Sequence, residues 1–89
     1  MDRVKKYNKI LSEIEIEIRE MAVFAEKLQI AQAKLDQLKT YYQTDWLHDF
    51  DAYPDQIGFG ILSEDAVYNT IEDYHQKEKE ILKLICNHL

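Results

Sequence analysis

Apolar side chains recur every three or four residues along the first half of the chain. The series runs Val4, Tyr7, Leu11, Ile14, Ile18, Met21, Ala25 and Leu28. Alternating steps of three and four place these side chains on one face of an α-helix, as in a coiled-coil heptad repeat. After Leu28 the series shifts by one extra step of three and continues as Ala31, Leu35, Leu38 and Tyr42. No glycine or proline interrupts this stretch, so the pattern predicts one helix over about residues 3–43.

A second helix is predicted over about residues 64–87. Ser63 is a favoured N-cap, and Glu64 and Asp65 follow in the first turn, where the helix dipole favours negative charge. Leu62 and Val67 stand at the two positions of a hydrophobic staple. The apolar stripe of this helix consists of Val67, Ile71, Tyr74, Ile81, Leu82, Ile85 and Leu89. These signals together predict an amphipathic helix.

The connection between the long helices also has a pattern. Trp46, Leu47 and Phe50 share one face of a short helix predicted over about residues 45–51, with Thr44 or Asp45 as its N-cap. Pro54 prevents that helix from continuing, and Gly58 and Gly60 give the following turns backbone freedom. The elements predict an all-α fold with one domain over residues 1–89, an antiparallel hairpin of a long and a shorter helix joined through the short one.

The unequal helix lengths leave apolar positions without a partner inside the chain. At 1.5 Å per residue, a helix of about 25 residues returns only to about residue 18 of the first helix. The positions beyond it are Val4, Tyr7, Leu11 and Ile14. A further ridge on the opposite face repeats every seven residues, as Ile16, Val23 and Ile30. Either the short helix folds over this ridge, or a second copy of the chain covers the apolar positions. We favour the homodimer, because a second copy can cover both the N-terminal apolar positions and the ridge.

The charge is distributed unevenly along the chain. The net charge is −6 over 89 residues, with +1 on residues 1–43 and −7 on residues 44–89. No lysine or arginine lies between Lys39 and Lys77, and eight of the ten aromatic residues fall within that window. An acidic balance argues against a nucleic-acid partner, because phosphate binding requires clustered basic side chains.

Two interpretations of the acidic, aromatic window remain open. The rings can form a small core that closes the end of the hairpin, with the carboxylates in solvent. Alternatively, the window presents a surface to a basic protein or a cationic group. The candidate partner-binding residues are Trp46, Asp49, Phe50, Asp51, Tyr53 and Asp55. The leading functional prediction is a non-enzymatic interaction module that self-associates and presents this surface.

Metal chemistry supplies the alternative prediction, a small ligand- or metal-binding protein. Asp45, His48 and Asp49 are spaced i, i+3 and i+4, and Glu72 and His75 form a Glu-x-x-His pair. These spacings are weak signals, because acidic residues are abundant here, and no cofactor is predicted.

Nothing in the sequence predicts enzymatic catalysis. The single cysteine, Cys86, has only sequence neighbours near it, and we expect it to be a packing residue that is at least half buried. One cysteine cannot form an internal disulfide. No apolar run approaches the roughly 20 residues that span a bilayer, and the N-terminus lacks a signal-peptide pattern. The chain is therefore predicted to be cytoplasmic, with no membrane partner.

The central segment resembles a known family. The residues concerned are the pair Tyr41 and Tyr42, then Trp46, the acidic stretch 49–55, and the run GILSEDAVY over residues 60–68. They are similar to a family of small uncharacterised proteins, known mainly from Gram-positive bacteria and catalogued as a domain of unknown function. The resemblance implies a small, helical, cytosolic bacterial protein and brings no catalytic residues. His48 departs from the family's pattern, which weakens the metal hypothesis.

Overall fold

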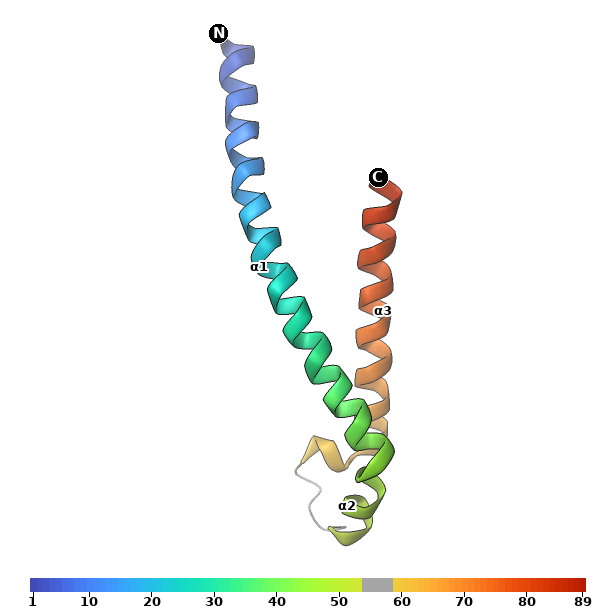
Figure 1. Ribbon diagram of the computed structural model, residues 1–89. Coiled ribbons are helices and arrows are strands. Elements are labelled where there is room, and N and C mark those ends of the chain that lie inside the picture. The colour runs from blue at the N-terminus through green and yellow to red at the C-terminus, as the bar shows by residue number, and fades with distance from the viewer. Residues whose placement is uncertain (54–58) are drawn as a thin grey trace. The chain divides into compact units, whose positions relative to one another are not determined.

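The computed structural model describes residues 1–53 and 59–89 (Figure 1). The elements are α1 (Asp2–Thr44), α2 (Trp46–Ala52), a 3-10 turn η1 (Gly60–Leu62) and α3 (Glu64–His88). The described residues contain no strand. The all-α class is confirmed, and each predicted helix boundary lies within one residue of the observed one. The predictions for Pro54, Asp55 and Gly58 fall outside the described residues.

Backbone hydrogen bonds connect Asp45, which lies between α1 and α2, to both helices. The Asp45 N–H donates to the Tyr41 carbonyl at 3.0 Å, and the Asp49 N–H donates to the Asp45 carbonyl at 3.1 Å. Asp45 keeps helical backbone angles and makes no side-chain cap. The Thr44 hydroxyl donates back to the Thr40 carbonyl at 2.7 Å. Asp45 therefore occupies the predicted N-cap position, but its carboxylate does not cap α2, and the Thr44 hydroxyl donates to α1 instead.

α3 begins as the sequence predicts. Ser63 adopts an extended conformation, and its hydroxyl accepts from the Ala66 N–H at 3.3 Å. The staple positions before and inside the helix, Leu62 and Val67, are half-buried and buried respectively. Ser63 thus fixes the point at which the chain enters α3.

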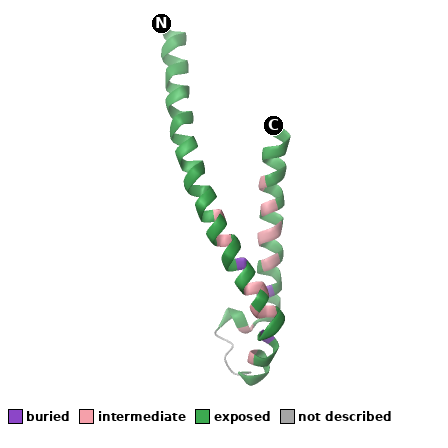
Figure 2. Ribbon diagram, in the orientation of Figure 1, coloured by how far each residue is buried: buried purple, intermediate pink, exposed green. Residues whose placement is uncertain are grey.

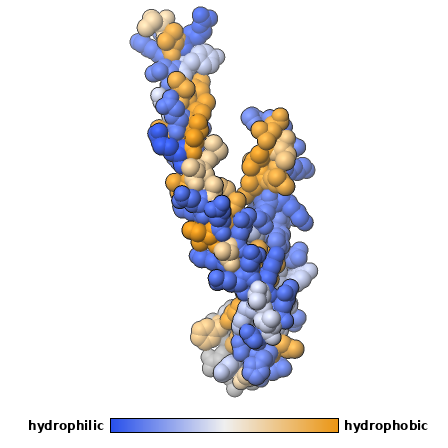
Figure 3. Space-filling model, in the orientation of Figure 1, coloured by the Kyte–Doolittle hydropathy of each residue, from blue (hydrophilic) through white to orange (hydrophobic). Residues whose placement is uncertain are grey.

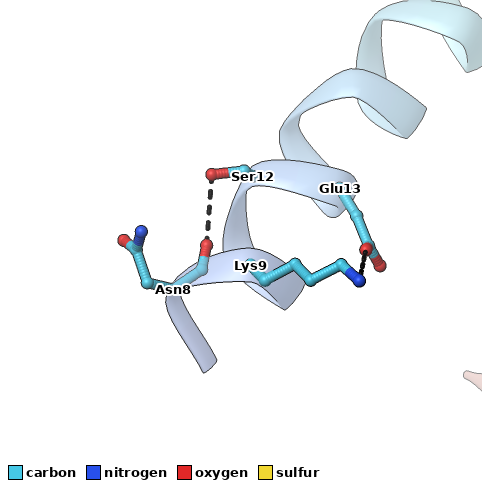
Figure 4. A network of polar contacts seen from close by, with 4 residues as sticks. All are labelled: Asn8, Lys9, Ser12 and Glu13. Atoms are coloured by element: carbon cyan, nitrogen blue, oxygen red, sulfur yellow. Dashed lines mark hydrogen bonds and ion pairs between the residues drawn. The ribbon is translucent and has the colours of Figure 1, made fainter. Parts of the chain in front are cut away.

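Contacts divide the chain into two units, Met1–Lys34 and Leu35–Leu89. The first unit is the N-terminal part of α1, where every residue except the half-buried Leu28 and Ala31 is exposed (Figure 2). The side-chain contacts drawn in Figure 4 are local. Ser12 Oγ donates to the Asn8 carbonyl at 3.1 Å, and Lys9 Nζ lies 3.9 Å from Glu13 Oε1 (Figure 4). Such contacts stabilise a helix only slightly. Because no residue of this unit is buried, the unit has no core of its own.

The second unit has a small core built around Trp46. Among its described residues, the buried ones are Leu35 from α1, Trp46 from α2 and Val67 from α3. The Trp46 ring stacks on Phe50 with ring centroids 5.0 Å apart, and Tyr42 lies 5.3 Å away at a tilt. Trp46 Nε1 donates to the Ile61 carbonyl at 2.6 Å, which ties α2 to η1. These rings support the interpretation of the aromatic window as an end core.

Candidate functional site

The predicted partner-binding residues divide between core and surface. Trp46 is only 5% exposed, so its ring belongs to the core of the second unit and is not available to a partner. Asp49 is half-buried, whereas Phe50, Asp51 and Tyr53 are exposed. Asp55 lies outside the described residues. The accessible part of the predicted surface therefore starts at Asp49 and leaves out Trp46.

An open pocket lies on this part of the second unit. Its lining comes from the end of α1, from α2 and its C-cap, and from the segment that leads into α3: Tyr41, Asp49, Tyr53, Phe59, Ile61 and Leu62. Its volume is about 490 Å³. Asp49 and Tyr53 belong to the predicted surface, and the other four residues were missed. The eight-residue spacing from Tyr41 to Asp49 was the available signal, because a continuous helix places such positions near one face.

Tyr41 and Asp49 are joined directly at the wall of this pocket. The Tyr41 hydroxyl donates to Asp49 Oδ2 at 2.5 Å. This hydrogen bond, then desolvation, then the charges of Asp49 and Asp45 raise the pKa of Tyr41 to about 12. The phenol therefore stays protonated and holds the carboxylate in place through the physiological range.

The raised pKa predicts a loss of stability at high pH. The folded pKa of Tyr41 exceeds the ordinary value of 10, so the stabilisation is complete below pH 10 and disappears as the pH rises through 12. We expect the melting temperature of the wild type to fall toward that of Tyr41→Phe over this interval. Thermal melts of both proteins at a series of pH values measure the difference. A difference that stays constant from pH 8 to 12 would contradict the assignment.

The predicted metal candidates do not assemble. No group of three or more His, Cys, Asp or Glu side chains with metal-binding geometry occurs in the described part of the chain. Asp49 accepts from Tyr41, and His75 Nδ1 lies 3.1 Å from Glu78 Oε1. Asp45, His48 and Glu72 are exposed. The weak hypotheses of an Asp45, His48 and Asp49 site and of a Glu72 and His75 site therefore find no support as three-ligand sites.

Cys86 corrects one further prediction. We expected a packing residue that is at least half buried, but the thiol is exposed near the end of α3. Burial on α3 ends with Ile81, and all residues after it are exposed. The apolar stripe of α3 therefore continues beyond the last residue that is even half-buried. A pattern of residue types does not show where such packing ends.

The predicted oligomer interface lies wholly on the exposed first unit. All its members are exposed: Val4, Tyr7, Leu11, Ile14, Ile16, Val23 and Ile30. An open hollow of about 420 Å³ on this unit is lined by Ile16, Arg19, Glu20, Val23, Phe24 and Lys27. Figure 3 shows hydrophobic side chains along the helix that begins at the N-terminus. Apolar surface of this extent is unusual for a helix without a partner.

The described helices include none that is both long and apolar enough to cross a membrane. Comparison with protein families shows a match to the family described as "Domain of unknown function (DUF4298)", over residues 4–84. No curated protein and no solved structure matches the chain.

Proposed function

The chain belongs to the DUF4298 family, and on this premise we propose that it is a non-enzymatic interaction module of the cytoplasm that self-associates through its first unit. The observation that carries the proposal is the complete lack of buried residues in Met1–Lys34, despite an apolar stripe along its length. The exposed thiol of Cys86 suits a reducing compartment. The exposed residues Phe50, Asp51 and Tyr53 supply a second, acidic and aromatic surface for a basic protein.

One heptad register links the exposed and the buried parts of α1. In the second unit this register runs through Leu35, Leu38 and Tyr42, which are buried or half-buried. Traced toward the N-terminus in steps of three and four, it passes through the half-buried Leu28 and Ala31 and then through exposed apolar side chains. We call these exposed positions the seam: Tyr7, Ile10, Ile14, Met21 and Phe24. The only polar residue within this register is Glu17. A partner helix on the seam would extend packing that α1 already uses.

The energetics favour covering the seam. Burial of a large apolar side chain is worth about 1.5–3 kcal/mol. Met21 is 61% exposed and Ile14 is 46% exposed, so both have apolar area left to bury. Helices in proteins gain most of their stability when an apolar face packs against another element. Association through the seam would therefore also stabilise α1 itself.

The charge pattern of the first unit selects a second copy in the antiparallel direction. Residues 3–9 carry four basic side chains and no acidic ones, whereas residues 13–20 carry four glutamates and one arginine. An antiparallel pair can place each basic block opposite the acidic block of the other chain. A parallel pair in register would place like charges together, which opposes association. The chain is therefore complementary to itself.

We further propose that the second unit contains the antiparallel hairpin that the sequence predicts. The hydrophobic positions of its two long segments form matching series that run in opposite directions. Leu35, Leu38 and Tyr42 in α1 correspond to Tyr74, Ile71 and Val67 in α3, and all six are buried or half-buried. The spacing is the same, four and three residues, in both segments.

Sedimentation equilibrium of the full chain tests self-association. Between about 1 and 300 μM we expect the mass to rise from the 10.6 kDa of the monomer to twice that value. Salt reports the direction of pairing, because screening weakens contacts between opposite charges and strengthens contacts between like charges. An antiparallel dimer becomes weaker between 50 and 500 mM NaCl. A constant mass of 10.6 kDa up to 300 μM would overturn the proposal.

A further inference from the structure

The pocket on the second unit combines aromatic rings with a carboxylate. Tyr41, Tyr53 and Phe59 contribute rings, Asp49 contributes the charge, and Ile61 and Leu62 complete an apolar wall. We call this pocket the aromatic cup. We propose that the aromatic cup binds an alkylammonium group, namely the side chain of a lysine on a protein partner. The inference rests on the proposed interaction function and names the chemistry of its partner surface.

The rings of the aromatic cup are accessible to a ligand. Tyr53 is 56% exposed and Phe59 is 62% exposed, although both are large enough to contribute strongly to a core. The face of an aromatic ring attracts a cation that lies within about 6 Å of its centre. Exposed rings around one pocket are a poor arrangement for stability and a good one for holding a cation.

The electrostatics of the second unit favour the same ligand. Asp49 lines the pocket and is half-buried, and the exposed Asp45 and Asp51 lie on either side of it in the sequence. No lysine or arginine occurs in residues 40–76, so none from that stretch can neutralise the pocket. The resulting negative potential draws in a cation and repels an anion.

The hydrogen bond between Tyr41 and Asp49 favours lysine over arginine. Arginine recognises a carboxylate best through two parallel hydrogen bonds, one to each oxygen. Tyr41 already donates to Oδ2 of Asp49, so the other oxygen is the better acceptor for a ligand. A compact ammonium group needs one such oxygen, while its methylene stem can pack on Ile61 and Leu62.

The volume of the aromatic cup is consistent with this ligand. About 490 Å³ is within the range of roughly 300–1,000 Å³ that small-molecule pockets occupy. A lysine side chain fills part of this volume and leaves room for the adjoining backbone of a peptide. The open form of the pocket suits a side chain presented by another protein.

Titration of the full-length protein with n-butylammonium chloride, observed by amide NMR, tests the proposal. This cation reproduces the end of a lysine side chain. At constant ionic strength we expect saturable shifts at Asp49, Tyr53 and Phe59. n-Butanol lacks the charge and n-butylguanidinium carries the arginine head group, so both should bind at least about threefold more weakly. Equal affinity for butanol, or tighter binding of the guanidinium, would overturn the assignment.

Matched variants place the ligand in the pocket. Asp49→Asn should weaken n-butylammonium binding about tenfold, and Tyr53→Ala about two- to fivefold. Asp51→Asn is the control, since it removes the same charge from the same helix at a residue outside the pocket lining. It should change affinity less than twofold. Tyr41→Phe keeps the ring but frees the second oxygen of Asp49, so the preference for n-butylammonium over n-butylguanidinium should become smaller. Equal losses in Asp49→Asn and Asp51→Asn would contradict a specific site.

The two proposals fail separately. Sedimentation of Asp49→Asn should match that of the wild type, because Asp49 belongs to the second unit. A dimer that does not bind the cation in the aromatic cup refutes only the cation site, whereas a monomer that binds it refutes only self-association.

Discussion

Trp46→Ala is expected to lower the free energy of unfolding of the second unit by about 3–5 kcal/mol, the usual cost of deleting a buried large aromatic side chain. The substitution removes the stacking on Phe50, the contact with Tyr42 and the hydrogen bond to the Ile61 carbonyl. Because only three of the described residues of this core are buried, the loss of one large ring removes much of its packing. Urea denaturation followed by far-ultraviolet circular dichroism measures the loss.

Two control variants separate the contributions to that loss. Trp46→Phe keeps a ring but removes the N–H donor, so we expect a smaller loss of about 1–2 kcal/mol. Leu47→Ala alters the adjacent residue of α2, which is 63% exposed, and should change stability by less than about 0.5 kcal/mol. If Trp46→Ala were no more destabilising than Leu47→Ala, the aromatic core would not support the second unit.

The second large effect is expected from charges placed on the seam. The double variant Ile14→Asp with Met21→Asp should raise the dissociation constant of the dimer about 100-fold or more, because two charged groups would replace apolar contacts in the interface and lose their hydration. Sedimentation equilibrium measures the change. The helical signal of the variant should also fall, since most of the stability of a helix in a protein comes from packing of its apolar face.

The ridge on the other face provides the matched comparison. Ile16 and Val23 have the same seven-residue spacing as Ile14 and Met21, but two residues along a helix turn the side chain by about 200°. A two-helix contact through the seam leaves this ridge uncovered, so Ile16→Asp with Val23→Asp should still form the dimer. Dissociation by both double variants would indicate an assembly of more than two helices. Dissociation by the ridge variant alone would place the interface on the ridge and refute the seam.

The sequence was sufficient for the helices but not for the role of each aromatic residue. Ser63 marks the start of α3 and the heptad pattern marks α1, because capping and periodicity are local properties of the chain. Trp46 was a candidate for a partner surface while an end core remained the other interpretation, and the structure buries its ring in that core. Composition places aromatics in a window, but burial depends on which of them meet residues distant in sequence.

The candidate site was predicted in part for the same reason. Asp49 and Tyr53 were identified from the acidic, aromatic window, whereas Tyr41 and Phe59 join them only through folding. The hydrogen bond from Tyr41 to Asp49 spans eight residues, across the junction of two helices. Its formation depends on the direction in which α2 leaves α1, which the pattern of residue types does not specify.

By itself, the sequence determined an all-helical chain with an unbroken first helix, an uneven charge and an apolar stripe longer than its own partner. These properties follow from residue type and spacing, which act within a few turns of helix. Only the tertiary structure decided that burial on α1 extends no further toward the N-terminus than Leu28, that Trp46 belongs to the core, and that Tyr41, Asp49, Tyr53 and Phe59 line one pocket. Those outcomes depend on contacts between segments far apart in the chain, and the hydrophobic effect that drives them is non-directional.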